Sequence, residues 1–382
     1  MTVTPEAGLD VVMDVTVTAH SSGGVGRYVM RLAEALRKAA DGSGVRFRTV
    51  DVPAARPGTH GVPCRADLVL PDPFYMSIPL LRRIPLRRGT EVRSRPERLG
   101  RLAGVTGGVF HHGGVQPSCP AGWSSVITHF DPSGLLHPEW HTRETVEFAE
   151  REREMVDAGS SVLAISDWAA RQAESCFGLP EGSAGSAPGA ADPLYSPGEP
   201  DTGVLSGFGL RRDGYVLHVG SFVPRKNIPF LLEIYGDCVN CGFALPLVLV
   251  GAEEWKPDAA LSGRSWARRI PVPDDADLLS LYRGARAVVL PSRYEGLGFP
   301  ALEAMACHVP LLCSSATALP GTVGGGGLLL DPDDGDAWGR AILSLDDPDR
   351  VAALARMAAS APRRTWEEAA RRAIEFYRRL VP

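Results

Sequence analysis

Short apolar runs alternate along the chain with segments of helical periodicity, an order typical of parallel α/β domains. The first run, at 9–17, predicts a buried strand, and a polar loop containing glycine follows it at 20–24. Val25, Val29 and Leu32 then recur with the spacing of one helix face. The chain is therefore expected to begin with a strand, a loop and a helix.

Two further strands are predicted in the first half, at 124–128 and 162–165. The first ends at His129, and the second precedes Ser166, a candidate helix cap. Residues 181–203 are rich in Gly, Ala, Ser and Pro. Such a stretch is expected to pack poorly and to connect two domains.

The alternation restarts after this connection. Four short buried strands are predicted, at 215–219, 247–250, 287–290 and 309–313. The tail has the periodicity of an amphipathic helix. The pattern thus predicts two doubly wound α/β domains and a C-terminal helix, with limits at 1–200, 201–362 and 363–382.

Charge and cysteine content narrow the class of protein. The net charge of −5 does not favour a nucleic-acid binder. The first residues lack a basic stretch followed by an apolar core, and no apolar run approaches the roughly 18 residues of a membrane span. Seven scattered cysteines favour reduced thiols, and the lone pair Cys238 and Cys241 has no second pair to complete a zinc site. We therefore expect a cytoplasmic protein.

The segment 290–308 carries the most informative chemistry. A strand ends at Leu290, a loop runs from Glu295 to Phe299, and Pro300 suits the first turn of a helix. In a doubly wound sheet this turn lies at the carboxyl edge, where ligands bind. Its glycines allow backbone N–H groups to approach an anion closely, and the helix dipole favours negative charge there.

Two carboxylates, Glu295 and Glu303, flank this turn. They would repel phosphate, but carboxylates accept hydrogen bonds well from sugar hydroxyls. The alternative is structural, with Glu303 favouring the positive end of its helix and Glu295 solvated in the loop.

Two other loops are candidates for binding an anion. Arg225 and Lys226 follow the strand at 215–219 and can neutralise a diphosphate, although an exposed basic turn is the alternative. The loop at 22–26, SGGVG, is a weak signal by itself. It lacks the G-x-G-x-x-G spacing, so it does not indicate dinucleotide binding.

Together these segments resemble glycosyltransferase family 4, whose members have the GT-B architecture of two facing Rossmann-like domains. The sequence EGLGFPALE at 295–303 fits the family's motif of two glutamates separated by seven residues. Similar stretches lie at 23–29, 127–141, 163–172, 215–227 and 276–296. The most similar subgroup contains bacterial mannosyltransferase-like enzymes, and the likeness implies that the C-terminal helix packs back on the N-terminal domain.

The resemblance implies three catalytic residues. Lys226 would stabilise the leaving diphosphate, Glu295 would hydrogen-bond the transferred sugar, and His129 would hold a sugar hydroxyl beside the anomeric carbon. Glu303 would bind the ribose, and Ile270, beside Arg269, would line the base pocket. The remaining donor-binding residues implied by the resemblance are Gly24, Arg225, Gly296, Leu297, Gly298 and Phe299, with the Gly24 N–H reaching the diphosphate across the interdomain cleft.

The implied activity is retaining transfer of a hexosyl group from a UDP- or GDP-linked sugar to an acceptor hydroxyl. A diphosphate oxygen would take the acceptor proton, without metal or cofactor. In agreement, the acidic clusters at 274–275 and 331–334 are expected in surface turns and not facing a diphosphate. The alternatives are a sugar-nucleotide epimerase and a non-catalytic nucleotide-sugar-binding protein.

The sequence also departs from the family pattern and adds to it. Ser221 stands where members often carry Arg or Lys, and His308 and Gly321 replace a usual Gly and Glu.

The stretch Arg82–Arg101 carries eight arginines against two glutamates. It predicts either a solvated loop or a landing surface for an anionic acceptor or membrane. We expect a polar acceptor, with membrane contact not favoured.

Overall fold

The computed structural model describes residues 8–19, 23–51, 68–69, 107–114, 119, 122–251 and 261–381. The basic stretch Arg82–Arg101 lies outside the described residues, as do Ser21 and Ser22 of the first loop. The chain divides into two compact units, the first formed by 1–135, 143–189 and 365–382 and the second by 136–142 and 190–364. The domain limits expected from the sequence stay a prediction.

Unit 1 is built on a parallel sheet. In the part of the chain that the structure describes, its seven strands have the order β3-β2-β1-β4-β5-β6-β7. The direction of winding reverses between β1 and β4, which is the topological switch point. The strands are β1 (Leu9–Asp14), β2 (Val45–Asp51), β3 (Leu68–Val69), β4 (Gly108–His112), β5 (Trp123–His129), β6 (Ser161–Ala164) and β7 (Gly185–Ser186).

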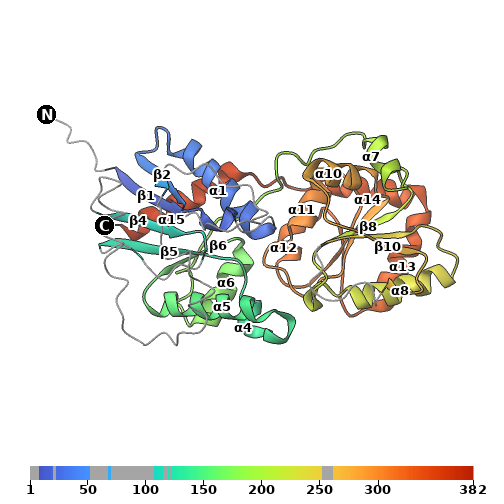
Figure 1. The fold of residues 1–382 in the computed structure, drawn as a ribbon, viewed down its shortest axis with the longest axis horizontal. Helices are drawn as coiled ribbons and strands as arrows, with labels where there is room; N and C mark the ends of the chain where they lie inside the picture. The colour runs from blue at the N-terminus through green and yellow to red at the C-terminus, as the bar shows by residue number, and fades with distance from the viewer. Residues whose placement is uncertain are drawn as a thin grey trace. The chain divides into compact units, whose positions relative to one another are not determined.

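Helices cover both faces of this sheet (Figure 1). Helices α1 and α15 lie together on one face, and α5 and α6 pack on the other, against Ile127 and Val162. The helices of unit 1, with the short α4 at the border of unit 2, are η1 (Thr16–Ala19), α1 (Gly24–Ala40), α4 (Ser133–Leu136), α5 (Arg143–Asp157), α6 (Asp167–Phe177) and α15 (Trp366–Leu380). Ser166 caps α6 as predicted, its hydroxyl accepting from the Ala169 amide at 3.0 Å.

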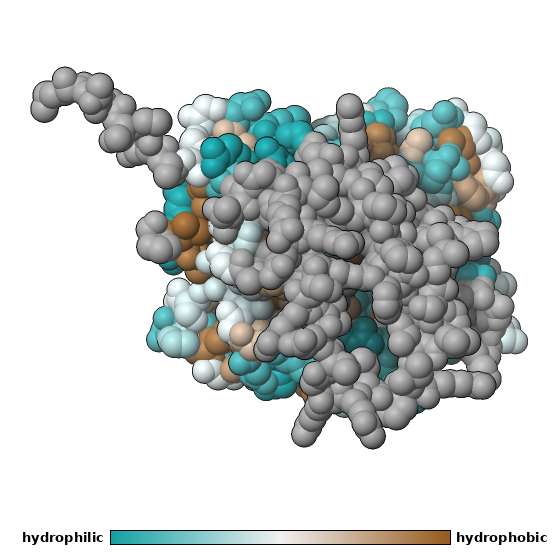
Figure 2. All heavy atoms as spheres, turned by 60° about the vertical axis from the view of Figure 1, so that its left-hand side comes forward, coloured by the Kyte–Doolittle hydropathy of each residue, from teal (hydrophilic) through white to brown (hydrophobic). Residues whose placement is uncertain are grey.

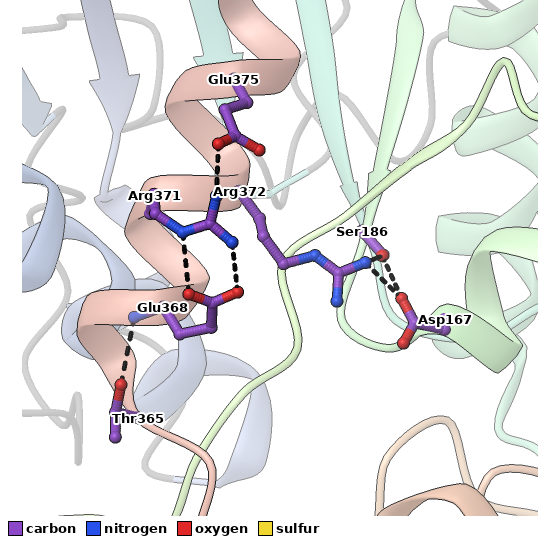
Figure 3. Close-up of polar contacts among 7 residues, drawn as sticks. All are labelled: Asp167, Ser186, Thr365, Glu368, Arg371, Arg372 and Glu375. Atoms are coloured by element: carbon purple, nitrogen blue, oxygen red, sulfur yellow. Dashed lines mark hydrogen bonds and ion pairs between the residues drawn. The ribbon is translucent and has the colours of Figure 1, made fainter.

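The C-terminal helix α15 packs on unit 1, against α1, as the fold prediction required. Its apolar face is buried, including Ile374, Phe376 and Tyr377. The Thr365 hydroxyl caps the helix by accepting from the Glu368 amide at 3.1 Å, and on the polar face Arg372 hydrogen-bonds Asp167 and Ser186 (Figure 3). This helix therefore completes unit 1, although it follows unit 2 in the chain.

The connection at 181–203 does not pack poorly, so this expectation is wrong. Gly185 lies against Phe376, where a Cβ would come within 2.4 Å of the ring. The Ala187 carbonyl accepts a 2.7 Å hydrogen bond from the buried hydroxyl of Tyr28, and Tyr195 is also buried. Gly185 is required because the backbone passes close to a large side chain, so this part of the segment is packed.

Unit 2 is built on a second parallel sheet. Counting described residues only, it has six strands in the order β10-β9-β8-β11-β12-β13, with the switch point between β8 and β11. The strands are β8 (Val216–Val219), β9 (Leu247–Val250), β10 (Ala267–Ile270), β11 (Ala287–Leu290), β12 (Leu311–Ser314) and β13 (Leu328–Leu330). The four strands predicted in this half are confirmed to within two residues at each end.

The core of unit 2 lies between this sheet and α8 and α13, where Tyr235 and Trp338 are fully buried (Figure 1). Helices α10 and α11 lie on the other side of the sheet. The helices of unit 2 are η3 (Pro138–Trp140), α7 (Thr202–Gly207), η4 (Pro224–Lys226), α8 (Ile228–Asn240), α10 (Asp275–Gly284), α11 (Phe299–Ala306), α12 (Leu319–Val323), α13 (Gly335–Leu343), η5 (Ser344–Asp346) and α14 (Pro348–Ser360).

The first strand is shorter than the predicted 9–17. The Asp14 carboxylate accepts from both the amide and the hydroxyl of Thr16, at 2.9 and 2.6 Å, and this turn ends the strand. Val17 therefore lies in the 3-10 turn η1.

On the face shown in Figure 2, the coloured residues include both hydrophilic and hydrophobic side chains. The large apolar side chains exposed among the described residues are dispersed along the chain: Leu136, Leu194, Val272 and Leu343. None of the described helices has both the length and the apolar character needed to cross a membrane.

Candidate active site

The site is centred on the switch point of the unit 2 sheet. Lys226 follows β8, Glu295 follows β11, and these strands are neighbours. The Lys226 Nζ donates to Glu295 Oε1 at 2.5 Å, and both side chains are nine-tenths buried. The structure thus brings two of the predicted catalytic residues into direct contact, 69 positions apart in the chain.

Glu295 is held as an anion by its neighbours. Ser292 Oγ donates to the same carboxylate at 2.8 Å, and Arg225 Nη1 lies 3.4 Å from Oε2. Burial alone would raise the pKa of Glu295, but the charges of Lys226 and Arg225 and the hydrogen bonds from Lys226 and Ser292 lower it to about 2. The predicted alternative of a solvated loop glutamate does not describe this buried side chain.

Backbone geometry holds the two loops together. The Arg293 amide donates to the Arg225 carbonyl at 2.8 Å. Asn227 adopts the left-handed conformation that ends η4, and its side-chain amide donates to the carbonyls of Pro291 and Pro332.

Thr317 also has a left-handed backbone, with φ of 56°, and its hydroxyl accepts from the Glu295 amide at 3.0 Å. A β-branched residue rarely adopts this conformation, and strain of this kind is typical of functional sites.

The loop 295–299 leads into α11, which begins at Phe299, one residue before Pro300. Gly298 has φ of 94°, and a Cβ there would lie 2.5 Å from Leu319, so only glycine fits. Gly296, Leu297 and Gly298 are all buried. Because the first amides of a helix have no acceptor within the helix, this end of α11 can bind an anion beside the Lys226 ammonium.

Glu303 projects from α11 and is buried. The Tyr282 hydroxyl, from α10, donates to its Oε2 at 2.7 Å. Burial, together with the negative charge of Glu303, raises the pKa of Tyr282 well above its usual value, so the phenol remains a hydrogen-bond donor. Tyr282 was not singled out from the sequence, although it lies within the stretch 276–296 that resembles the family.

Ile270 is the last residue of β10 and is buried at the carboxyl edge of the same sheet. Its strand is separated from β8 by β9. The structure therefore places Ile270 at the edge that carries Lys226 and Glu295, two strands away from Lys226.

His218 is a site neighbour that sequence reasoning missed. Its Nδ1 lies 2.9 Å from the Val289 carbonyl, which can only accept a hydrogen bond. In the neutral imidazole Nδ1 therefore carries the proton, and Nε2 can only accept. Burial lowers the pKa of His218 to about 4, and Lys226 adds to this effect. The signal was present in the sequence, because a histidine inside the predicted strand at 215–219 must find a partner when buried.

Unit 1 carries the other two predicted site residues. Gly24 is the first residue of α1, whose N-terminus lies after β1. His129 is the last residue of β5, and its Nδ1 lies 2.6 Å from Glu152 Oε1 of α5. Both side chains of this pair are buried, with exposed fractions of 0% and 4%.

The acidic clusters have structural partners. Asp274 caps α10 by accepting from the Asp277 amide, and Asp334 caps α13 by accepting from the Ala337 amide. Asp333 pairs with Arg293 at 2.8 Å. The described part of the chain contains no group of three or more His, Cys, Asp or Glu arranged to hold a metal ion.

Comparisons with known proteins identify the class. The family model described as "Glycosyl transferases group 1" matches residues 213–347, which include Lys226, Glu295 and Glu303. The chain is 35% identical over 268 residues to O-antigen chain mannosyltransferase B of Escherichia coli, covering 67% of this chain and 70% of that protein. It is 33% identical over 212 residues to D-inositol 3-phosphate glycosyltransferase of Rhodococcus opacus, covering 50% of this chain and 47% of that protein.

Solved structures share the fold over nearly the whole chain. Sucrose-phosphate synthase from Thermosynechococcus elongatus gives a TM-score of 0.69 at 20% identity and covers 97% of this chain and 99% of its own. WaaG, a glycosyltransferase involved in lipopolysaccharide biosynthesis, gives 0.66 at 15% identity, with coverage of 96% and 99%. Anabaena HepE, solved in complex with UDP and glucose, gives 0.62 at 14% identity, with coverage of 97% and 98%.

The chain belongs to the group 1 glycosyltransferases and has the GT-B fold. It is a hexosyltransferase that moves a sugar from a nucleotide sugar, and enzymes of this group typically need no metal cofactor. The family, the fold class and the type of reaction expected from the sequence are confirmed. The epimerase and the non-catalytic binder are not supported.

Proposed function

We propose that the chain is a retaining hexosyltransferase that binds a UDP- or GDP-linked sugar at the carboxyl edge of the unit 2 sheet. The observation that supports this most strongly is the contact between Lys226 and Glu295 at the switch point, beside the N-terminus of α11. Cationic side chains and a helix N-terminus suit the diphosphate, and carboxylates suit the hydroxyls of the sugar and ribose.

Charge balance gives each residue a role. Glu295 neutralises Lys226, and Arg225 adds a second positive charge. A bound diphosphate supplies negative charge, so Lys226 can turn to it and stabilise it as it leaves. Glu295 is then available to accept from a hydroxyl of the transferred sugar, while Glu303, oriented by Tyr282, accepts from the ribose.

Retention follows if the acceptor attacks from the side that the diphosphate leaves. The acceptor O–H then gives its proton to a diphosphate oxygen as the new glycosidic bond forms and the sugar–phosphate bond breaks. Lys226, Arg225 and the α11 amides carry the electrostatic stabilisation in this scheme.

A mannose nucleotide as donor and inositol phosphate as acceptor are the first substrates to test. The two relatives named above are called a mannosyltransferase and an inositol 3-phosphate glycosyltransferase. Thermal stabilisation by UDP, GDP, ADP and dTDP identifies the base, because a ligand raises the apparent stability of the state that binds it. The matching mannose and glucose nucleotides are then incubated with acceptors, and NMR reports the anomeric configuration of the product.

A retained configuration and full activity in EDTA are the expected results. Product of inverted configuration, or activity that EDTA removes and manganese restores, would contradict the proposal. An Arg293→Gln variant is the matched control, because Arg293 lies in the same loop but is exposed and pairs with Asp333. It should keep normal stabilisation by the nucleotide.

A further inference from the structure

The His129 side chain in unit 1 has a buried ring nitrogen with no protein partner. Nδ1 is bonded to Glu152, but Nε2 makes no hydrogen bond within the described residues. A buried polar atom without a partner destabilises the fold, so such atoms are rare and call for an explanation. The ring lies at the carboxyl end of β5, the edge at which doubly wound sheets bind ligands.

The ring cannot turn to satisfy Nε2. A flip would break the 2.6 Å contact with Glu152, and the Phe177 ring packs edge-on against the imidazole at a centroid distance of 5.5 Å. The Glu152 carboxylate accepts, so Nδ1 must carry a proton. The pair therefore presents Nε2 in one fixed direction.

We propose that Glu152 is a positioning residue that keeps His129 as an imidazolium, so that its Nε2–H donates to a sugar hydroxyl oxygen of a substrate. This inference rests on the proposed function, which supplies the ligand. Neutral His129 would offer only a lone pair at Nε2, whereas the imidazolium offers a charged donor, which forms a stronger hydrogen bond.

The groups around the ring agree with this charge state. Burial by itself would lower the pKa of His129, but the charge and hydrogen bond of Glu152, together with the charge of Asp131, raise it. Arg153 is the nearby cation on α5, and it stacks over Phe177 and donates to the Cys176 carbonyl instead of facing the imidazole. The adjacent strand β6 contributes the apolar Ala164 beside His129.

The first test measures the charge directly. NMR titration of histidine labelled with ¹³C and ¹⁵N, with His129→Ala identifying the signal, gives the pH midpoint of His129. In Glu152→Gln the midpoint should fall by about one pH unit or more, because the opposite charge is gone. Glu152→Asp keeps the charge and should lie closer to wild type. Glu154→Gln, exposed on the same helix, should leave the midpoint unchanged.

The second test measures function. The alkaline limb of kcat/KM should follow the loss of the imidazolium proton, so in Glu152→Gln it should move to lower pH. An unchanged His129 midpoint in Glu152→Gln, or an equal change in Glu154→Gln, would overturn the proposal. The NMR result does not depend on turnover, so a failure of the proposed function would appear separately, as an absence of transfer by the wild-type protein.

Discussion

Lys226 and Glu295 form a buried ion pair that joins the ends of two adjacent strands. Their shared hydrogen bond is 2.5 Å long, and Ser292 donates to the same carboxylate oxygen. Removing one partner of a buried pair leaves the other as an uncompensated charge, which costs about 3–5 kcal/mol. The pair therefore links the stability of unit 2 to its catalytic charge.

Replacing Lys226 by Ala should reduce kcat by about 100- to 1,000-fold, because the leaving diphosphate loses its main charge partner. The free energy of unfolding should also fall, since the buried Glu295 loses its nearer counterion and keeps only Arg225, at 3.4 Å. Steady-state kinetics and urea denaturation measure the two effects.

The double variant Lys226→Ala/Glu295→Gln separates these effects. It should recover part of the lost stability, because the buried charge is removed, while activity stays low. Wild-type turnover in a folded Lys226→Ala protein would refute the assignment of Lys226.

Replacing Glu303 by Ala should mainly weaken nucleotide binding. Loss of a hydrogen bond to a charged group costs about 1.5–3 kcal/mol, which is roughly a 10- to 100-fold rise in Kd. Tyr282→Phe should raise Kd less, since the carboxylate remains but loses the hydroxyl that orients it. Calorimetric titration with the nucleotide found by the stability screen measures both. Equal affinity in Glu303→Ala and wild type would exclude a role in binding the ribose.

His218 should make unit 2 sensitive to acid. Burial lowers its pKa from 6.5 to about 4, so below pH 6.5 the unfolded chain binds a proton that the folded chain does not. The free energy of unfolding is therefore unaffected by His218 above pH 6.5 and falls progressively as the pH drops towards 4. The loss at pH 5 is about 2 kcal/mol.

His218→Asn tests this acid sensitivity, because the Asn amide can still donate to the Val289 carbonyl but does not titrate. In urea denaturation at pH 7 and pH 5, this variant should lose about 2 kcal/mol less than wild type between the two pH values. The partly exposed His137→Asn is the control and should behave as wild type does. A wild-type pH dependence in His218→Asn would rule out this account.

Tyr377→Phe should destabilise unit 1 by about 1–3 kcal/mol. The Tyr377 hydroxyl lies 2.6 Å from Nδ1 of the buried His111, whose Nε2 contacts Thr128 at 2.9 Å. Without the hydroxyl, Nδ1 is buried with no partner. Thermal unfolding measures the change, and Glu375→Gln on the exposed face should cost less than about 1 kcal/mol. Equal losses in the two variants would mean that the buried bond contributes nothing.

The sequence predicted the parts of the site that local pattern controls. Glu295 and Glu303 were placed on a strand–loop–helix segment because a short apolar run, two glycines and a proline mark its boundaries. Lys226 was placed at a strand end because it follows the short apolar run at 215–219. Since parallel strands end at one edge of a sheet, their convergence follows from the fold class.

What the sequence did not predict depends on contacts between distant elements. Glu152 lies on a helix with several other glutamates, and only packing of α5 against the sheet distinguishes it from exposed Glu154. Tyr282 on α10 is likewise distinguished only by a contact with another helix, its hydrogen bond to Glu303. The packing of 181–203 could not be predicted, because small residues occur both in flexible linkers and where the backbone passes close to large side chains.

The return of α15 to unit 1 has a consequence for synthesis of the chain. A ribosome produces the chain from the N-terminus, and domains generally fold as units as they emerge. Unit 2 has all of its residues once Arg364 is made, but unit 1 still lacks Ile374, Phe376 and Tyr377 at that moment. The unit that begins first is thus completed last. Until then, the apolar surface that α15 covers is exposed to chaperones and to other nascent chains.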